Sequence, residues 1–109
     1  FDMNTEYKFR EVLGQKVFGA AEEAAAYIWE NDYDEEEKIN EYYVSFFIAQ
    51  ENGLYERVEE YHYERAYSIE EIEQALQAAG LALLEVTDGY CFAPPQEKSE
   101  RLLFVAKLK

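Results

Sequence analysis

The only histidine of this 109-residue sequence lies between two glutamates. His62 alternates with Glu60 and Glu64, so the three side chains share one face if this stretch is a β-strand. Histidine titrates near neutral pH, with an ordinary pKa of about 6.5, so His62 could act as a general base or orient an amine or hydroxyl group. The alternative is a histidine on a solvated strand face.

Carboxylates and aromatic rings around this histidine favour a positively charged ligand. A charged cluster is formed by Glu59, Glu60, Glu64 and Arg65. Its carboxylates could select a cationic or amine substrate, although solvated charges at a strand edge give the same pattern. Aromatic rings attract ammonium groups, and five rings could form a wall around the methyl groups of an amine. They are Tyr27, Trp29, Tyr33, Tyr42 and Tyr43. The alternative for most of them is packing in the core of a sheet.

A polar residue near the start of the chain, Asn4, could also touch a ligand. Asp2 and Asn4 occur where a strand is expected to end in a turn, and ligands of open α/β sheets lie beyond the carboxyl ends of the strands. Asn4 could equally serve to form the turn. No metal site is expected, because the acidic run at 32–37 lacks the glycine and ligand spacing of a calcium loop. Cys91 has no cationic neighbour in sequence and is expected to be a buried, small hydrophobic residue.

The histidine and its glutamates lie on a predicted β-hairpin. Residues 38–67 are rich in Ile, Val, Tyr and Phe on both sides of Asn52-Gly53, which is the strongest short hairpin signal. If Asn52 and Gly53 form a two-residue loop, Tyr43 lies directly opposite His62 on the same face. A shift of one residue would exchange the two faces, so this assignment depends on the type of turn.

The rest of the chain predicts further strands and one clear helix. Residues 69–79 have apolar side chains at helical spacing, with Ser68 as N-cap, Glu71 completing a capping box and Gly80 as C-cap. We also predict strands at 27–33, 82–92 and 102–108, a short helix at 5–14, a helical turn or loop at 20–26 and an acidic connector at 32–37. The last two strands are expected to pair antiparallel.

The charge of the chain excludes several kinds of partner. Asp and Glu number 24 against 10 Lys and Arg, which gives a formal net charge of −14. Phosphate backbones and anionic lipids repel such a chain, so neither nucleic acid nor membrane is expected as a partner. A single cysteine permits no internal disulfide, which favours a reducing, cytoplasmic location. The hydrophobic content of 49% is enough for one folded domain.

Five stretches carry a family resemblance when they are taken in order. They are FDMNTEYKF (1–9), YIWENDYDEE (27–36), LYERVEEYHYERAYSIEEI (54–72), LQAAGLALLEV (76–86) and SERLLFVAK (99–107). Together they resemble the C-terminal part of a class I S-adenosylmethionine-dependent methyltransferase, in the small bacterial branch with an inserted antiparallel lid. The chain begins with Phe1 rather than Met, which favours a piece of a longer protein over a processed start.

The resemblance implies an α+β fold. It would combine an antiparallel lid sheet with a β-hairpin, one well-capped helix and the terminal antiparallel strands of a truncated Rossmann-like methyltransferase core. Residues 1–13 would be the end of the fifth core strand and the following helix, and residues 14–67 the antiparallel lid or substrate-binding insert. Residues 68–109 would be the last core helix and the terminal strand pair.

The resemblance also implies a methyl transfer from S-adenosylmethionine to a small-molecule acceptor in the intact enzyme. Residues of the lid and of the fifth strand would bind the acceptor: Asn4, Tyr27, Trp29, Tyr43, Glu60 and His62. No catalytic side chain is expected, because methyl transfer depends on alignment of the reactants and on a desolvated site.

The glycine-rich loop that binds the methyl donor in this family is missing. The chain has five glycines, and no two of them have Gly-x-Gly spacing. We therefore expect that this chain alone binds no S-adenosylmethionine and is not catalytic. The alternative is a self-contained acidic module that binds a small ligand or another protein. A core sheet cut before its fifth strand would expose an edge and an apolar face, so we also expect a homodimer or higher oligomer formed through residues 102–108 or the face beside them.

Overall fold

A computed structural model describes every residue from Phe1 to Lys109. The chain divides into two compact units, one made of residues 1–12 and 66–109 and the other of residues 13–65. The fold is α+β, with two antiparallel sheets and one main helix, as the sequence predicts. None of its helices has the length and apolar character needed to span a lipid bilayer.

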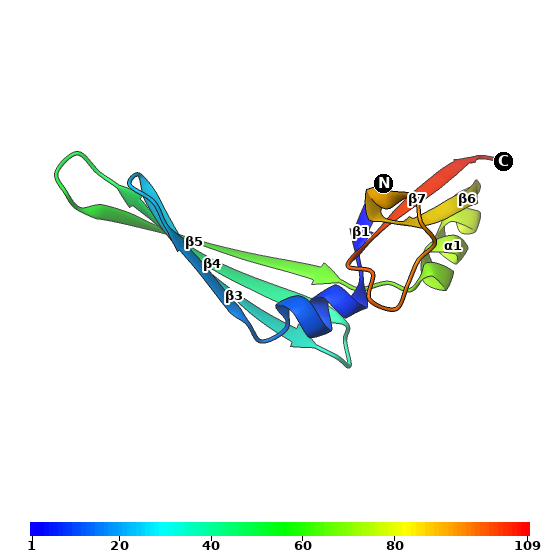
Figure 1. Cartoon of the computed structure of the whole chain (residues 1–109), viewed down its shortest axis with the longest axis horizontal. Coiled ribbons are helices and arrows are strands. Elements are labelled where there is room, and N and C mark those ends of the chain that lie inside the picture. The colour runs from blue at the N-terminus through cyan, green and yellow to red at the C-terminus, as the bar shows by residue number, and fades with distance from the viewer. The chain divides into compact units, whose positions relative to one another are not determined.

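The first unit contains a three-stranded antiparallel sheet in the order β1–β7–β6 (Figure 1). The central strand β7 (Arg101–Leu108) pairs with β6 (Leu81–Asp88) on one side and with the short β1 (Asp2–Asn4) on the other. The ring of Phe1 stacks on Phe104, with the ring centroids 5.1 Å apart. The predicted antiparallel pair of C-terminal strands is confirmed.

The N-terminus of helix α1 (Ile69–Ala78) is capped as the sequence predicts, whereas its C-cap is Ala79, one residue before the predicted Gly80. The backbone N–H of Glu71 donates to Ser68 Oγ at 3.1 Å, and the N–H of Ser68 donates to Glu71 Oε1 at 3.2 Å. These two bonds satisfy donors that the first turn of a helix leaves without intrahelical partners. Gly80 follows with a left-handed φ of +83°, which ends the helix before β6. In Figure 1, α1 lies beside β6.

A hydroxyl also begins the short N-terminal helix, η1 (Lys8–Leu13), which is of the wide π type. The N–H of Lys8 donates to Thr5 Oγ1 at 3.1 Å, and the N–H of Phe9 donates to the carbonyl oxygen of Thr5 at 3.2 Å. The Thr5 hydroxyl in turn donates to the carbonyl oxygen of Ser99 at 2.6 Å. The predicted short helix is therefore confirmed, and its start is tied to the loop before β7.

The predicted strand at 82–92 is too long. β6 ends at Asp88, and Gly89–Cys91 forms a short 3₁₀ turn, η2. Gly89 has a φ of +54°, and the Thr87 hydroxyl donates to the carbonyl oxygen of Gly89 at 2.8 Å, which closes the turn. Cys91 lies on this turn and is exposed, so the expectation that it is buried is wrong.

The second unit is a four-stranded antiparallel meander in the order β2–β3–β4–β5. The strands are β2 (Val17–Ala21), β3 (Ala25–Asp34), β4 (Ile39–Ala49) and β5 (Tyr55–Arg65). Figure 1 shows β3, β4 and β5 running side by side as long arrows. The predicted strand at 27–33 and the hairpin at Asn52-Gly53 are both confirmed.

The expected helical turn or loop at 20–26 is wrong for most of its length. β2 ends at Ala21 and β3 begins at Ala25, so only a short bend connects them. Alanine favours helices when nothing else decides, but Ala20 pairs with Tyr27 across the hairpin. Cross-strand pairing therefore overrides a weak local preference.

The acidic segment after β3 forms the next turn. Asp34, the last residue of the strand, accepts hydrogen bonds at Oδ1 from the N–H groups of Glu36 and Glu37, at 2.9 and 3.2 Å. Lys38 then adopts a left-handed φ of +58° and leads into β4. The acidic connector is thus shorter than the predicted 32–37, because Asp32 and Asp34 still belong to β3.

The predicted register of the β4–β5 hairpin is wrong by one residue. Tyr43 pairs with Tyr61, and Tyr42 pairs with His62. Side chains alternate between the faces of a strand, so Tyr43 and His62 lie on opposite faces rather than on the same one.

The length of the loop explains the shift. The N–H of Gln50 donates to the carbonyl oxygen of Leu54 at 2.8 Å, and the N–H of Gly53 donates to the carbonyl oxygen of Gln50 at 3.2 Å. Gly53 has a left-handed φ of +81°. A tight turn followed by a left-handed glycine is the usual three-residue hairpin loop. Compared with a two-residue loop, the third loop residue shifts the pairing of every β5 residue with β4 by one position.

Replacing Gly53 with alanine is expected to destabilise this hairpin, because a side chain rarely adopts a φ of +81°. We expect the free energy of unfolding to fall by about 1–2 kcal/mol. Urea denaturation followed by circular dichroism measures the change.

The matched control is Gly19→Ala, in β2. Its new methyl group would meet the carbonyl oxygen of Tyr27 at 3.4 Å, an ordinary contact, and Gly19 has no positive φ. This variant is expected to change stability by less than about 0.5 kcal/mol. Equal losses in both variants would contradict the assigned turn.

Candidate functional site

One face of the four-stranded sheet gathers four of the six predicted site residues. Val44 on β4 pairs with Trp29 of β3 on one side and with Glu60 of β5 on the other, so the three side chains share a face. Tyr27 and His62 lie two positions along their strands from Trp29 and Glu60 and therefore share it too. We call this surface the aromatic face; its central members are Phe18, Tyr27, Trp29, Tyr42, Val44, Phe46, Val58, Glu60, His62 and Glu64.

Aromatic rings contact one another across this face. Trp29 lies between Phe18 and Tyr42, with ring centroids 5.1 and 5.9 Å away. Tyr27 lies against Phe46, with the centroids 6.5 Å apart. The indole Nε1 of Trp29 is buried and has no hydrogen-bond partner. Trp29 is therefore the centre of the aromatic contacts and leaves one polar hydrogen unsatisfied.

An open apolar hollow of about 250 Å³ lies on the aromatic face, lined by Tyr27, Trp29, Val44 and Phe46. An apolar space of this order is large enough for a small organic group. The hollow thus offers a place where the apolar part of a ligand can be removed from water.

Acidic residues and the histidine line the β5 side of the aromatic face. His62 Nε2 lies 3.1 Å from Glu60 Oε2, and both side chains are more than half exposed, at 61% and 51%. The hydroxyl of Tyr42 donates to Glu64 Oε2 at 2.9 Å. The geometry therefore puts carboxylates next to aromatic rings, a combination suited to a cation.

The structure does not bring Tyr43 to the other predicted residues. Its ring stacks on Tyr61 on the opposite face of the sheet, with the centroids 4.7 Å apart, and its hydroxyl accepts a hydrogen bond from Arg57 Nη2 at 2.9 Å. Partial desolvation, with smaller contributions from Tyr43 and Glu59, raises the pKa of the Tyr61 hydroxyl above its usual value. Tyr43 thus belongs to a cluster of tyrosine and arginine on the other face.

Asn4 belongs to the first unit, where it joins a polar network at the strand end. Arg101 Nη2 donates to Asn4 Oδ1 at 3.3 Å, and Arg101 Nη1 lies 3.3 Å from Asp2 Oδ1. The hydroxyl of Tyr90 donates to Asp2 Oδ2 at 2.7 Å. This bond is the main reason that the pKa of Asp2 lies below its usual value, with Arg101 acting in the same direction. The same bond raises the pKa of Tyr90.

Replacing Tyr90 with phenylalanine is expected to raise the pKa of Asp2, because it removes the largest cause of the lowering. A carboxyl group with a lowered folded-state pKa stabilises the fold above its unfolded pKa of about 3.9, and this contribution is lost as the pH falls through the folded value. The variant should lose part of this pH dependence. NMR titration of the Asp2 carboxyl carbon measures the pKa directly.

The control is Tyr55→Phe, which removes an exposed tyrosine hydroxyl from the other unit. It is expected to leave the pKa of Asp2 unchanged. An unchanged Asp2 pKa in the Tyr90→Phe protein would show that the hydroxyl does not stabilise the carboxylate.

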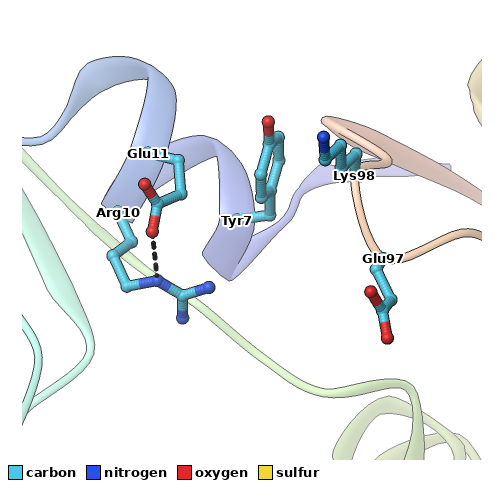
Figure 2. Close-up of a pocket in the computed structure, with 5 residues that line it drawn as sticks. All are labelled: Tyr7, Arg10, Glu11, Glu97 and Lys98. Carbon is cyan, nitrogen blue, oxygen red and sulfur yellow. Dashed lines mark hydrogen bonds and ion pairs between the residues drawn. The ribbon is translucent and has the colours of Figure 1, made fainter.

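A second open hollow, of about 620 Å³, lies in the first unit (Figure 2). Tyr7, Arg10 and Glu11 of the N-terminal helix line one side, and Glu97 and Lys98 of the loop before β7 line the other. Arg10 is paired twice, with Glu6 Oε1 at 2.8 Å and with Glu11 Oε1 at 3.0 Å. Its guanidinium is thus already neutralised by the protein, which argues against a ligand-binding role.

Neither unit provides an evident cofactor or metal site. The chain has no Gly-x-Gly spacing, which a dinucleotide-type cofactor loop would require. No group of three or more histidine, cysteine, aspartate or glutamate side chains comes together in a way that could hold a metal ion.

No protein-family model matches the sequence. Two curated bacterial proteins do, both named "putative methyltransferase". The chain is 34% identical over 107 residues to one from Geobacillus sp. (strain WCH70) and 33% identical over 108 residues to YqeM from Bacillus subtilis (strain 168). Each alignment covers 98% of this chain and 43% of the relative. The chain thus spans less than half the length of the curated relatives that it matches.

Solved structures show the same relationship. The chain superimposes on an S-adenosylmethionine-dependent methyltransferase from Clostridium acetobutylicum ATCC 824 with a TM-score of 0.85 and 34% identity. The match covers 99% of this chain and 43% of that one. The chain is homologous to part of an S-adenosylmethionine-dependent methyltransferase. The resemblance predicted from the sequence, to the C-terminal part of this family, is confirmed.

A more distant structure, the CcbJ methyltransferase of Streptomyces caelestis, shares the fold alone. Its TM-score is 0.72 at 15% identity, and the match covers 98% of this chain and 41% of that one. The methyltransferase fold of this region therefore persists where little sequence similarity remains.

Val44 and Phe46 both line the apolar hollow, although the predicted site does not include them. A two-residue loop at Asn52-Gly53 would pair Val44 with Tyr61 and would put Val44 and Phe46 on the strand face opposite His62. The signal that could have found them is the alternating pattern of β4 combined with the correct loop length.

Proposed function

We propose that residues 14–67 form the lid of a methyltransferase that uses S-adenosylmethionine, and that the aromatic face lines the pocket of its small-molecule acceptor. The observation that carries the proposal is the apolar hollow bordered by Trp29, with Glu60 in register on the same face. Homology to methyltransferases over nearly the whole chain supports the reaction. It also favours this proposal over a self-contained acidic binding module.

In this proposal, residues 1–13 and 68–109 are the terminal elements of a truncated Rossmann-like core. The order β1–β7–β6, with β7 antiparallel to both neighbours, supports the assignment of these strands to a core sheet. Because the chain carries no Gly-x-Gly loop, we assign none of its residues to S-adenosylmethionine, which would be held by the rest of the intact protein.

The lid would exclude water from the reacting group and would orient the acceptor. Aromatic side chains around the hollow would exclude water from the reacting group, and the carboxylates and His62 beside it would orient polar atoms of the acceptor. Asn4 lies in the other unit, and its part in acceptor binding stays a prediction. Tyr43 faces away from the hollow, and we leave it out of the proposed pocket.

Self-association is part of the proposal for the isolated chain. β7 pairs with β1 at residues 101–103, and the backbone of Phe104 exchanges two hydrogen bonds with Phe1, so β7 offers an open edge only beyond Phe104. Val105 and Leu108, which lie on this stretch, are 42% and 78% exposed. An unpaired strand edge with apolar side chains favours pairing with a second copy.

The central test is Trp29→Ala in the intact protein that contains this chain. We expect the KM for the acceptor to rise about tenfold, because the loss of one aromatic wall costs roughly 1–2 kcal/mol of binding. The affinity for S-adenosylmethionine should stay within about twofold, because the lid would not hold the cofactor. Steady-state kinetics and calorimetry measure the two quantities.

The control variant is Tyr61→Ala, which removes an aromatic ring from the opposite face of the same sheet. It should leave both quantities unchanged. Equal effects of the two variants, or an intact protein that transfers no methyl group, would contradict the proposal. The 109-residue chain alone should show no S-adenosylmethionine binding tighter than about 100 μM, which corresponds to about −5.5 kcal/mol.

A further inference from the structure

We propose that the hollow of the aromatic face binds an organic ammonium ion, with the Glu60 carboxylate as its counter-charge. This inference rests on the proposed function and narrows it, because it names an amine as the class of the methyl acceptor. The amine would bind as its ammonium ion and would release one proton to solvent through the open hollow before transfer. Its nitrogen lone pair would then form the new N–C bond as the S–C bond of the methyl donor breaks and the neutral thioether leaves. The inference is carried by three features of the face: the row of side chains through Val44, the distribution of charge over the two faces of the sheet, and the apolar lining of the hollow.

The row through Val44 has the dimensions of a cation site. Trp29, Val44 and Glu60 are paired neighbours on three adjacent strands. Adjacent strands lie about 4.8 Å apart, so the backbones at Trp29 and Glu60 are roughly 10 Å apart, with the small Val44 side chain between them. An ammonium group above Val44 would lie within about 6 Å of the indole ring and near the carboxylate at the same time.

Aromatic rings also flank Val44 along its own strand. Tyr42 and Phe46 lie two positions away on the same face. The Tyr42 ring is stacked on Trp29, and the Phe46 ring lies against Tyr27. A group above Val44 is therefore bordered by aromatic rings on three sides and by a carboxylate on the fourth. This arrangement attracts a cation by the ring faces and by Coulomb interaction together.

The charges of the sheet are divided between its two faces. On β3, β4 and β5 the aromatic face carries Glu56, Glu60 and Glu64 and no lysine or arginine. The two arginines of β5, Arg57 and Arg65, both lie on the opposite face, where Arg57 pairs with Glu59 at 2.6 Å. An anionic ligand would thus meet mainly carboxylates on the aromatic face, whereas a cation finds Glu60, whose carboxylate contacts His62 rather than an arginine.

The apolar lining distinguishes an organic ammonium ion from an inorganic cation. The four residues around the hollow present rings and a branched aliphatic side chain and offer no oxygen ligands in the number that calcium or magnesium requires. Methyl or methylene groups on the nitrogen would fill the hollow, and the charge would face Glu60.

The test uses the fluorescence of Trp29, which is the only tryptophan of the chain. The 109-residue chain is titrated with choline and with 3,3-dimethyl-1-butanol, a neutral molecule of nearly the same shape. We expect choline to bind at least about tenfold more tightly, because cation–π contact and the carboxylate act only on the charged ligand. Equal affinities, or no saturable change with choline, would overturn the inference.

Two matched variants distinguish the contribution of the Glu60 carboxylate to choline binding from that of the net negative charge of the protein. Glu60→Gln should weaken choline binding by about fivefold to tenfold, which is the loss of one partly exposed charge contact of about 1 kcal/mol. Glu59→Gln removes the same charge from the neighbouring position on the opposite face and should change binding by less than about twofold. Equal weakening by both variants would show that only bulk charge attracts the ligand.

The result of this binding experiment can be distinguished from the result of the methyl-transfer test of the proposed function. The binding experiment needs neither S-adenosylmethionine nor methyl transfer, and choline cannot accept a methyl group on its nitrogen. Choline binding without methyl transfer by the intact protein would overturn the proposed function alone. Methyl transfer to uncharged acceptors, with no preference for choline over its neutral analogue, would overturn this inference alone.

Discussion

Pairing of Val44 with Trp29 on one side and Glu60 on the other is the interaction on which the candidate site depends. Side chains of a β-strand alternate between two faces of the sheet. One residue more or less in the connecting loop would therefore move every side chain of β5 to the face opposite the one it occupies. The left-handed Gly53 completes a three-residue loop and so determines this pairing. With it, Glu60 and His62 lie on the face of Trp29; without it, Tyr61 and Tyr63 would take their places.

The same alternation separates two kinds of chemistry on one sheet. The aromatic face combines stacked rings, an apolar hollow and carboxylates, whereas the opposite face carries tyrosines and Arg57, which forms an ion pair with Glu59. A sheet with an exposed cationic partner on both faces would offer no charge preference to a ligand. Because Arg57 and Glu60 lie on opposite faces of the sheet, Arg57 does not neutralise the Glu60 carboxylate on the aromatic face. The net charge alone does not show where on the sheet a cation would bind.

Local chemistry explains which parts of the fold could be predicted from the sequence. The capping box at Ser68 and Glu71, and the turn signal at Asn52-Gly53, act through bonds between near neighbours, so the helix and the hairpin were predicted correctly. The alanine-rich stretch at 20–26 was not, because its conformation is decided by pairing with β3 rather than by its own preference. The register failed for a related reason: an Asn-Gly pair is compatible with loops of two or three residues, and the hydrogen bond from Gln50 to Leu54 that decides between them is not visible in the sequence.

The register of β4 against β5 is the most direct test of this account, because the aromatic face exists as described only if it is correct. Cross-strand NMR contacts between backbone protons of the 109-residue chain measure it. We expect contacts that pair Tyr42 with His62 and Val44 with Glu60. Contacts that pair Tyr43 with His62 and Val44 with Tyr61 would move Glu60 and His62 to the opposite face from Trp29 and would contradict it.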